Sequence, residues 1–387
     1  MRSVNWTRKR RLAGAAAMVA ALLALTGCGG PAGDDSGAVR IGLLANLTGD
    51  AAMSFGKPFE QGFELALQEA EPILAESNVS IEVLTEDAKS AVPSAVTGYN
   101  KLRQQNVPLV VQDSQSPLGQ AVAPLANDDR ITLVSGAGSA LENSGGFSFR
   151  FTDLTTPTVS VGGRLAQEGH KRIGLVVAGD NPSFTTLADA TEKGLPTGFA
   201  SRQEVSSQDT DFSAVLANLR RDQLDAVVLS VLPAQAGNLI LQMKHAGEFE
   251  NVKLVGTVAI SGETYTVARD SARGFEFPQV WAPGGPNPSQ FERSYTEKFG
   301  EIPTAYGALG YQVGWTTVAA VIQATGKNGT VDGSALRDVL PAASTSDLVR
   351  EHGILGLEMT ADGLAISSGV MATFADGGSM VLAGSDG

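Results

Sequence analysis

The sequence predicts an α/β protein of two lobes, each a parallel β-sheet flanked by helices. Short apolar runs alternate with amphipathic stretches from Val39 onward, and strands that alternate with helices form parallel sheets covered on both faces. This alternation occurs once before and once after about residue 152, which indicates two lobes of one architecture. Runs such as "AVVLSVL" are apolar throughout, as is typical of strands buried on both faces.

The first lobe is predicted to begin with four strands separated by three helices. One stretch carries Phe59, Phe63, Ala66 and Ala70 at near-helical spacing, so it is expected to form an amphipathic helix. The expected strands are 39–44, 79–87, 107–113 and 131–136, and the expected helices are 58–74, 91–105 and 117–129.

The same pattern resumes after Arg150 and predicts the second lobe. The expected helices are 157–169, 185–194, 212–222 and 233–247, and the expected strands are 172–179, 225–232 and 253–258. Two later helices, 288–300 and 306–326, are expected to return to the first lobe. The tail, 353–384, is expected to form β-hairpins with turns at Asp362–Gly363 and at 376–378.

Breaks in this pattern predict where the chain passes between the lobes. One break lies near "FRFTDLTT", and a second lies in "FEFPQVWAPGGPNP", where proline and glycine accumulate. The predicted first lobe comprises 39–152 plus 281–345, and the predicted second lobe comprises 153–280 plus 346–387.

The first 27 residues are expected to be an export signal that ends at a lipid-bearing cysteine. A basic cluster, 8–11, precedes an uncharged apolar run that is shorter than the roughly 20 residues needed to span a bilayer. Residues 25–28, "LTGC", resemble the bacterial lipobox, in which the cysteine carries the lipid. Cys28 is the only cysteine, which excludes an internal disulfide and a CxxC site. The alternative is an unmodified thiol. Residues 28–38 are small and polar and are expected to form a flexible tether.

Composition and missing motifs narrow the class of function. The formal net charge of −13 argues against nucleic acid or anionic lipid as a partner. The three histidines, His170, His245 and His352, have no metal-ligating or nucleophilic neighbour at a recognisable spacing. GxSxG, HExxH, GxxxxGK and GxGxxG are all absent from the sequence. We therefore expect no enzyme activity, no cofactor and no metal site.

Four stretches together resemble the type I periplasmic binding proteins of branched-chain amino acid ABC transporters, the Leu/Ile/Val-binding group, in a lipoprotein form. They are "IGLLANLTGDAAMSFGKPFEQGFELALQEAE", "ITLVSGAGSALEN", "IPTAYGALGYQVGWTTVAAV" and "GILGLEMTADG". The likeness runs from about Val39 to about Phe374. It implies two α/β lobes, three hinge strands and a cleft that closes on a small ligand.

The resemblance places part of the ligand site at strand ends of the first lobe. In open α/β sheets ligands lie at the carboxyl ends of the strands, where helix N-termini suit a carboxylate. Ser116 precedes Pro117, and serine is a favoured N-cap while proline is a favoured first helical residue. Ser116 matches the family serine that meets the ligand carboxylate, and Ala137 and Ser139 match the family's Ala-x-Thr pair. The alternatives are a pure helix cap for Ser116 and an ordinary loop hydroxyl for Ser139.

The remaining implied positions line the two walls of the cleft. Phe55 and Tyr306 match aromatic residues of the first lobe, with core packing as the alternative for each. In the second lobe, Phe184 and Leu232 match two family tyrosines but lack their hydroxyl groups. The acidic partner of the ligand ammonium falls at Val258, and Glu263, a few residues on, is a candidate substitute.

The resemblance implies a solute-binding lipoprotein on the outer face of the cell membrane. Its expected partners are a small ligand (an amino acid, an amide or an organic acid), the permease subunits of an ABC importer, and the membrane through the lipid on Cys28. The alternative is a ligand-sensing receptor domain of the same fold that signals to a membrane partner.

Overall fold

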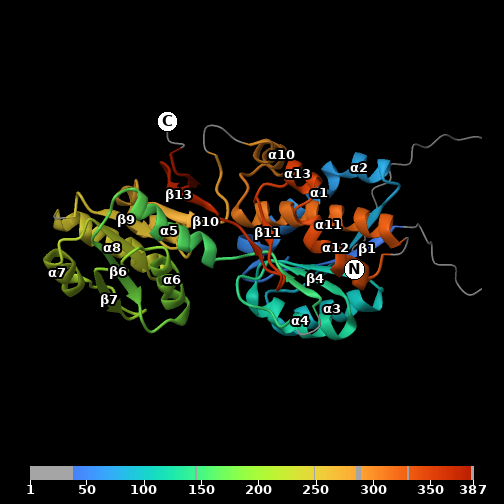
Figure 1. The fold of residues 1–387 in the computed structure, drawn as a ribbon, viewed down its shortest axis with the longest axis horizontal. Helices are drawn as coiled ribbons and strands as arrows, with labels where there is room; N and C mark the ends of the chain where they lie inside the picture. The colour runs from blue at the N-terminus through green and yellow to red at the C-terminus, as the bar shows by residue number, and fades with distance from the viewer. Residues whose placement is uncertain (1–37, 144–145, 248, 285–288, 329–330, 385–387) are drawn as a thin grey trace, which may run out of the picture.

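The protein consists of two α/β lobes that lie side by side (Figure 1). A computed structural model describes residues 38–143, 146–247, 249–284, 289–328 and 331–384. The expected export signal and Cys28 lie outside these residues, as does all but the last residue of the expected tether. The predicted α/β class, with parallel sheets flanked by helices, is confirmed.

The first sheet is wholly parallel, with the strand order β2-β1-β3-β4-β5. Side chains alternate along β1, so that Ile41 and Leu43 enter one core while Leu44 enters the core on the other face. The first of these cores includes helices α1, α11 and α12, and the second includes α3 and α4. The elements are β1 (Val39–Ala45), η1 (Ala52–Gly56), α1 (Lys57–Glu69), α2 (Glu71–Glu76), β2 (Ile81–Asp87), α3 (Val92–Gln104), β3 (Leu109–Gln112), α4 (Ser116–Asp129), β4 (Thr132–Ser135), β5 (Ser148–Arg150), α10 (Gln290–Phe299), α11 (Ala305–Asn328), α12 (Gly333–Ala343) and α13 (Asp347–His352).

The second sheet is also parallel, with the order β7-β6-β8-β9, and has its own apolar core. Strand β7 was not expected from the sequence, because only its two terminal residues are buried. An antiparallel sheet, β10-β13-β14, extends this lobe. The elements are α5 (Thr155–Gln167), β6 (Ile173–Ala178), α6 (Pro182–Lys193), β7 (Ser201–Val205), α7 (Ser213–Arg221), β8 (Ala226–Ser230), α8 (Pro233–Ala246), β9 (Lys253–Gly256), α9 (Gly262–Ala268), η2 (Arg269–Ala272), β10 (Phe277–Gln279), β13 (Val370–Phe374) and β14 (Met380–Leu382).

The predicted tail hairpins are confirmed. Strand β11 (Glu358–Met359) pairs antiparallel with β12 (Ala365–Ile366), and β13 pairs antiparallel with β14. Gly363, Gly377 and Gly378 have φ angles of 80°, 82° and 89°. Turns that need a positive φ favour glycine, which explains why these turns are visible in the sequence.

Helices α1 and α11 touch backbone to backbone through glycine. A Cβ atom at Gly310 would lie 2.0 Å from the carbonyl oxygen of Phe59, and one at Gly62 would lie 1.9 Å from the carbonyl oxygen of Gly307. Helix packing usually separates axes by about 8–10 Å according to the side chains in contact. Here the absence of side chains permits a close approach, which joins α11 to the N-terminal part of the lobe.

The cores indicate where the chain crosses between the lobes. Val349, Leu355 and Ala365 lie in the first core, whereas Ala372 lies in the second. The limits predicted from the sequence place all four of these residues in the second lobe. We propose lobe limits that keep the first two crossings near 151–154 and 280–284 and move the third from about 345 to 367–369.

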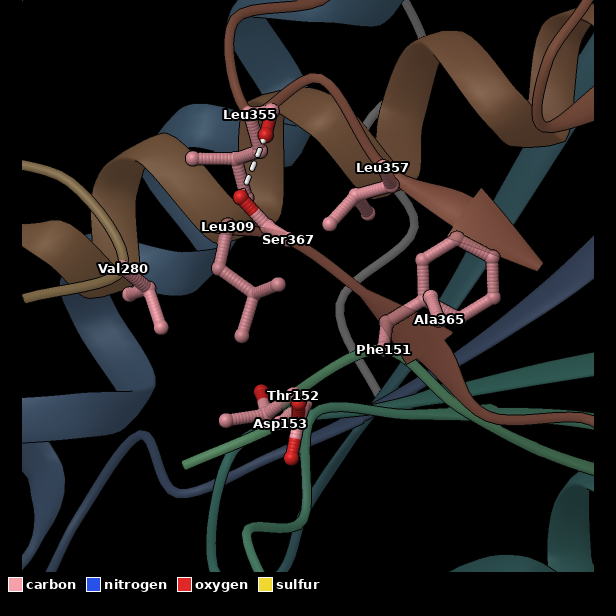
Figure 2. A pocket seen from close by; sticks show the side chains of 9 residues that line it. All are labelled: Phe151, Thr152, Asp153, Val280, Leu309, Leu355, Leu357, Ala365 and Ser367. Carbon is pink, nitrogen blue, oxygen red and sulfur yellow. Dashed lines mark hydrogen bonds between the residues drawn. The ribbon is translucent and has the colours of Figure 1, made fainter. Parts of the chain in front are cut away.

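A small hollow lies where these three crossings meet (Figure 2). Its lining includes Thr152, Val280 and Ser367, one residue from each of the three crossings. Leu309 of α11 lies opposite Thr152. Thr152 is 8% exposed, and its hydroxyl oxygen makes no hydrogen bond to any described residue. Among the described residues, this hollow therefore has a buried hydroxyl without a hydrogen-bond partner.

We expect Gly310→Ala to destabilise the protein strongly, because its methyl group would overlap the Phe59 carbonyl and force α1 and α11 apart. Overpacking of this kind costs about 3 kcal/mol of the free energy of unfolding. Gly326→Ala on the same helix meets no atom within 4 Å and should gain up to about 1 kcal/mol from helix propensity. Chemical denaturation measures both values, and equal effects of the two substitutions would contradict the proposed close packing.

We expect Thr152→Val to raise the free energy of unfolding by about 1 kcal/mol, because it removes a buried hydroxyl that lacks a partner. Thr158→Val is the matched control. The hydroxyl of Thr158 donates to the carbonyl of Leu154 at 2.9 Å, so its removal should cost about 1 kcal/mol. A loss of stability in Thr152→Val, measured by thermal unfolding, would show that this hydroxyl has a partner such as a bound water.

Candidate functional site

The first-lobe candidates come from loops that follow the carboxyl ends of neighbouring parallel strands. Phe55 follows β1, Ser116 follows β3, and Ala137 and Ser139 follow β4. Because these strands are adjacent and parallel, their carboxyl ends share one edge of the sheet. Tyr306 reaches the same region from the first turn of α11.

Phe55 and Tyr306 form an aromatic pair. Their ring centroids lie 4.6 Å apart with an interplanar angle of 63°, which is an edge-to-face arrangement, and both side chains are half-buried. Burial raises the pKa of Tyr306 to about 12, so its hydroxyl stays neutral at physiological pH. Gly56 lets the loop after β1 lie against the strand end, because a Cβ there would lie 2.0 Å from the carbonyl oxygen of Asn46.

Ser116 and Ser139 contact each other. The backbone N–H of Ser139 donates to the hydroxyl oxygen of Ser116 at 3.1 Å. The predicted capping role of Ser116 needs correction, because Gln115 is the N-cap and Ser116 is the first residue of α4. The side chain of Ser116 is therefore half-buried against the β4 loop instead of capping its own helix.

The backbone N–H of Ala137, a candidate donor to the ligand, is bonded within the protein. It donates to the hydroxyl oxygen of Ser135 at 3.1 Å, and Ala137 is fully buried. The side chain of Ser139, by contrast, is exposed. Of the three predicted polar positions, Ser116 and Ser139 are thus the ones whose side chains solvent can reach.

A buried polar cluster that the sequence analysis missed lies beneath these loops. Asn46, Gln112, Asp113 and Ser135 are all fully buried and joined by hydrogen bonds. Burial raises the pKa of the Asp113 carboxyl, although hydrogen bonds from Asn46, Gln115 and Gln112 counteract part of this effect. The sequence carries one signal for this cluster: polar residues stand at the ends of three apolar strands, in "LLAN", "VVQD" and "LVSG".

The second-lobe candidates occupy less accessible positions. Phe184, in α6, is 6% exposed and belongs to the second core, and its carbonyl accepts a hydrogen bond from the Ser230 hydroxyl at 2.7 Å. Leu232 is the N-cap residue of α8 and packs against the same core. This arrangement favours core packing for Phe184 and places Leu232 at the start of α8, against the second core.

Val258 and Glu263 lie in the segment between β9 and α9 and at the start of α9. Val258 is half-buried. Glu263 is exposed in the first turn of α9, where its backbone N–H donates to the capping hydroxyl of Ser261. The position expected to hold an acidic partner for a ligand ammonium is therefore apolar, and the nearby carboxylate faces solvent.

The structure brings the first-lobe candidates together as two contacting pairs, Phe55 with Tyr306 and Ser116 with Ser139. Among the described residues, no hydrogen bond or aromatic contact joins either pair to Phe184, Leu232 or Val258. None of the eight predicted ligand-facing residues lines the hinge hollow.

The described residues also bear on the other predicted features. They contain no group of three or more histidine, cysteine, aspartate or glutamate side chains arranged to hold a metal ion. Within the same part of the chain, no helix is both long and apolar enough to cross a membrane.

Comparison with known proteins identifies a matching family and relatives of this chain. A family profile described as periplasmic binding protein matches residues 38–378. The Leu/Ile/Val-binding protein homolog 1 of Brucella abortus (strain 2308) is 25% identical over 321 residues, which cover 80% of this chain and 83% of the relative.

Solved structures share the fold at low identity. A putative branched-chain amino acid ABC transporter protein from Rhodospirillum rubrum has a TM-score of 0.76 at 18% identity, covering 89% of this chain and 99% of the other. The substrate-binding protein LivJ from Streptococcus pneumoniae, in complex with isoleucine, has a TM-score of 0.65 at 21% identity, with coverages of 89% and 97%. A solute-binding protein from R. palustris, in complex with benzoate, has a TM-score of 0.63 at 19% identity, with coverages of 90% and 96%.

These findings confirm the family resemblance drawn from the sequence. They also confirm the expectation that the protein is not an enzyme, because the matching family is one of binding proteins and these relatives carry binding or transport names. The profile spans both lobes and every predicted ligand-facing position. The chain belongs to the periplasmic binding protein family.

Proposed function

We propose that the protein is a lipid-anchored, extracytoplasmic solute-binding protein that captures a small ligand between its lobes for an ABC importer of the branched-chain amino acid type. The observation that carries this proposal is the pairing of Phe55 with Tyr306 and of Ser116 with Ser139 at strand ends of the first lobe. An apolar surface beside polar groups is what a small-molecule site requires, and the carboxyl edge of an α/β sheet is where such sites lie.

The chemistry of the two lobes supports a ligand with an acidic or amide head and an apolar or aromatic body. Ser116 and Ser139 offer hydroxyl and N–H groups near the start of α4, and helix N-termini favour anions. Phe55 and Tyr306 offer ring surface to an apolar body. The neighbouring folds bind both an amino acid, isoleucine, and an aromatic acid, benzoate.

The second lobe decides between these two ligand classes. An amino acid carries an ammonium group, and a buried charge without a partner is strongly disfavoured. At the expected position of that partner stands Val258, and Glu263 is exposed. Benzoate and similar acids carry no ammonium group, so they do not need a counter-charge in this wall. We therefore favour a carboxylate or amide over leucine, isoleucine or valine.

We expect a thermal-shift screen of the domain without its leader to respond to aromatic acids, other carboxylates or amides more strongly than to leucine. A ligand at 100 times its dissociation constant adds roughly 2.7 kcal/mol to the free energy of unfolding. A lost hydrogen bond to a charged group costs roughly 1.5–3 kcal/mol, so leucine should bind at least about tenfold more weakly than the best acid. Calorimetry with benzoate and with leucine measures this difference.

Glu263→Gln is the control for this prediction, because Glu263 is the carboxylate nearest to the missing partner in the sequence. If the natural protein bound leucine at micromolar concentration or more tightly, the favoured ligand class would be wrong. Loss of that binding in Glu263→Gln would then identify Glu263 as the ammonium partner, whereas benzoate binding should not change in this variant.

We expect Cys28→Ser to abolish membrane attachment, because the sequence contains no other cysteine to carry a lipid. Stable anchoring relies on burial of lipid methylene groups, each worth about 0.8 kcal/mol. Cell fractionation and metabolic labelling with a fatty acid measure the effect, with Thr26→Ser as a control that keeps the cysteine. A Cys28→Ser protein that is processed and still retained at the membrane would contradict the proposed anchor.

A further inference from the structure

Asp113 is a fully buried carboxylate whose described partners are all hydrogen-bond donors. Its Oδ2 accepts from the backbone N–H of Asn46 at 2.8 Å and from the Asn46 side-chain amide at 2.9 Å. Its Oδ1 accepts from Gln112 Nε2 at 2.9 Å and from the Gln115 backbone N–H at 3.3 Å. An ionised carboxylate is an acceptor only, so this donor set matches the ionised form.

Backbone groups fix the orientation of both neighbouring amides. The Asn46 oxygen Oδ1 accepts from the backbone N–H of Ser90 at 2.7 Å, so its NH₂ group must face Asp113. Gln112 Nε2 also donates to the backbone carbonyl of Gln115 at 3.3 Å, which sets its NH₂ toward Asp113 as well. Backbone donors and acceptors cannot be exchanged, so neither amide can turn over without losing a bond.

The same bonds continue to the loop after β4. The other end of the Gln112 amide, Oε1, accepts from the Ser135 hydroxyl, whose oxygen in turn accepts from the Ala137 N–H at 3.1 Å. Gly119 leaves room for this contact, because a Cβ there would lie 2.8 Å from both Gln112 Oε1 and Ser135 Oγ. One connected set of bonds thus runs from the loops after β1 and β2, through Asp113, to the loop after β4.

Three of the loops that these bonds connect, those after β1, β3 and β4, lead to or hold a residue of the proposed ligand site. The loop after β1 leads to Phe55 through Gly56, which packs on Asn46. The loop after β3 holds Ser116, and the loop after β4 holds Ser139. Among the described residues, Asp113 makes no hydrogen bond to the side chains of Phe55, Ser116 or Ser139, so its effect on them passes through Asn46, Gln112 and Gln115.

We infer that Asp113 is the positioning residue of the first-lobe half of the ligand site and holds the loops after β1, β3 and β4 in one arrangement. The inference rests on the proposed function only in taking these loops as ligand-facing. A buried charge that is satisfied solely by neutral donors is costly to place, which is consistent with the raised pKa of this carboxyl. The Asp113 carboxylate acts by orienting its neighbours, because fully satisfied buried polar networks rigidify the segments they join.

Asp113→Asn is the sharpest substitution, because it keeps the size of the side chain and removes acceptor capacity. If the new NH₂ group takes the place of Oδ2, it faces the two donors of Asn46. If it takes the place of Oδ1, it faces the donors of Gln112 and Gln115. Either orientation opposes donors to donors and breaks the connection between the β1 side and the β4 side.

We expect hydrogen–deuterium exchange of the ligand-free protein to quicken at least tenfold in Asp113→Asn, in peptides covering both 46–56 and 135–140. The second lobe and the α1–α11 contact should exchange as in the natural protein. Asp129→Asn is the matched control: this carboxylate accepts from Tyr99 and Arg103 at the far end of α4, and its substitution should leave both peptides unchanged.

The inference is overturned if the faster exchange is confined to 112–116, or if it spreads evenly over the whole first lobe as in general destabilisation. Binding supplies a second readout, with benzoate and leucine as the probes. Whichever of them binds the natural protein should bind Asp113→Asn at least tenfold more weakly and Asp129→Asn equally well; equal affinity for Asp113→Asn would also overturn the inference. If neither probe binds the natural protein, the favoured ligand class fails while the exchange result still decides the role of Asp113.

Discussion

The docking of α11 on α1 is the contact on which the first lobe depends. Helix α11 follows the elements of the second lobe from α5 to β10 in sequence, yet it supplies Trp315, Val318 and Val321 to the core beneath the first sheet. Its glycine face allows the two backbones to touch. Because the chain must return to make this contact, it must cross between the lobes more than once. The same docking carries Tyr306 to Phe55, so the aromatic half of the proposed site is a consequence of this contact.

Features set by local sequence were predictable. The alternation of apolar strands and amphipathic helices predicted both parallel sheets, and glycine at positive φ marked the tail turns. Strand β7 was not predicted, because its "SRQEV" pattern buries only its terminal residues. Helix α12 was not predicted either. The limit predicted for the third crossing, at about residue 345, differs from the proposed 367–369 because Val349 and Leu355 pack in the first core, which no local pattern reveals.

The same distinction explains what could be predicted of the site. Ser116 and Ser139 follow strands that neighbour each other, so a helix start and a strand end suffice to bring them together. Asp113 was missed because its significance depends on donors both from its own segment, Gln112 and Gln115, and from Asn46, which is distant in the sequence. For Phe184 the difficulty is different. An aromatic residue near a strand end can face a ligand or a core, and the packing of its own lobe decides which.

The two halves of the proposed site differ in kind, and this difference suggests how they would discriminate between ligands. In the first lobe the Ser139 N–H is already bonded to Ser116, so a ligand gains there only by offering a better acceptor. A carboxylate does so, because hydrogen bonds to charged groups are roughly twice as strong as neutral ones. In the proposed second-lobe wall, Leu232 and Val258 would present apolar surface, which would favour an apolar body by about 25 cal/mol for each Å² covered but would offer no partner to a cation. The first lobe would thus select a carboxylate head group, and the second lobe would reject a ligand that carries a positive charge. Such rejection by an unpartnered charge is a stronger discriminator than a small difference in apolar contact.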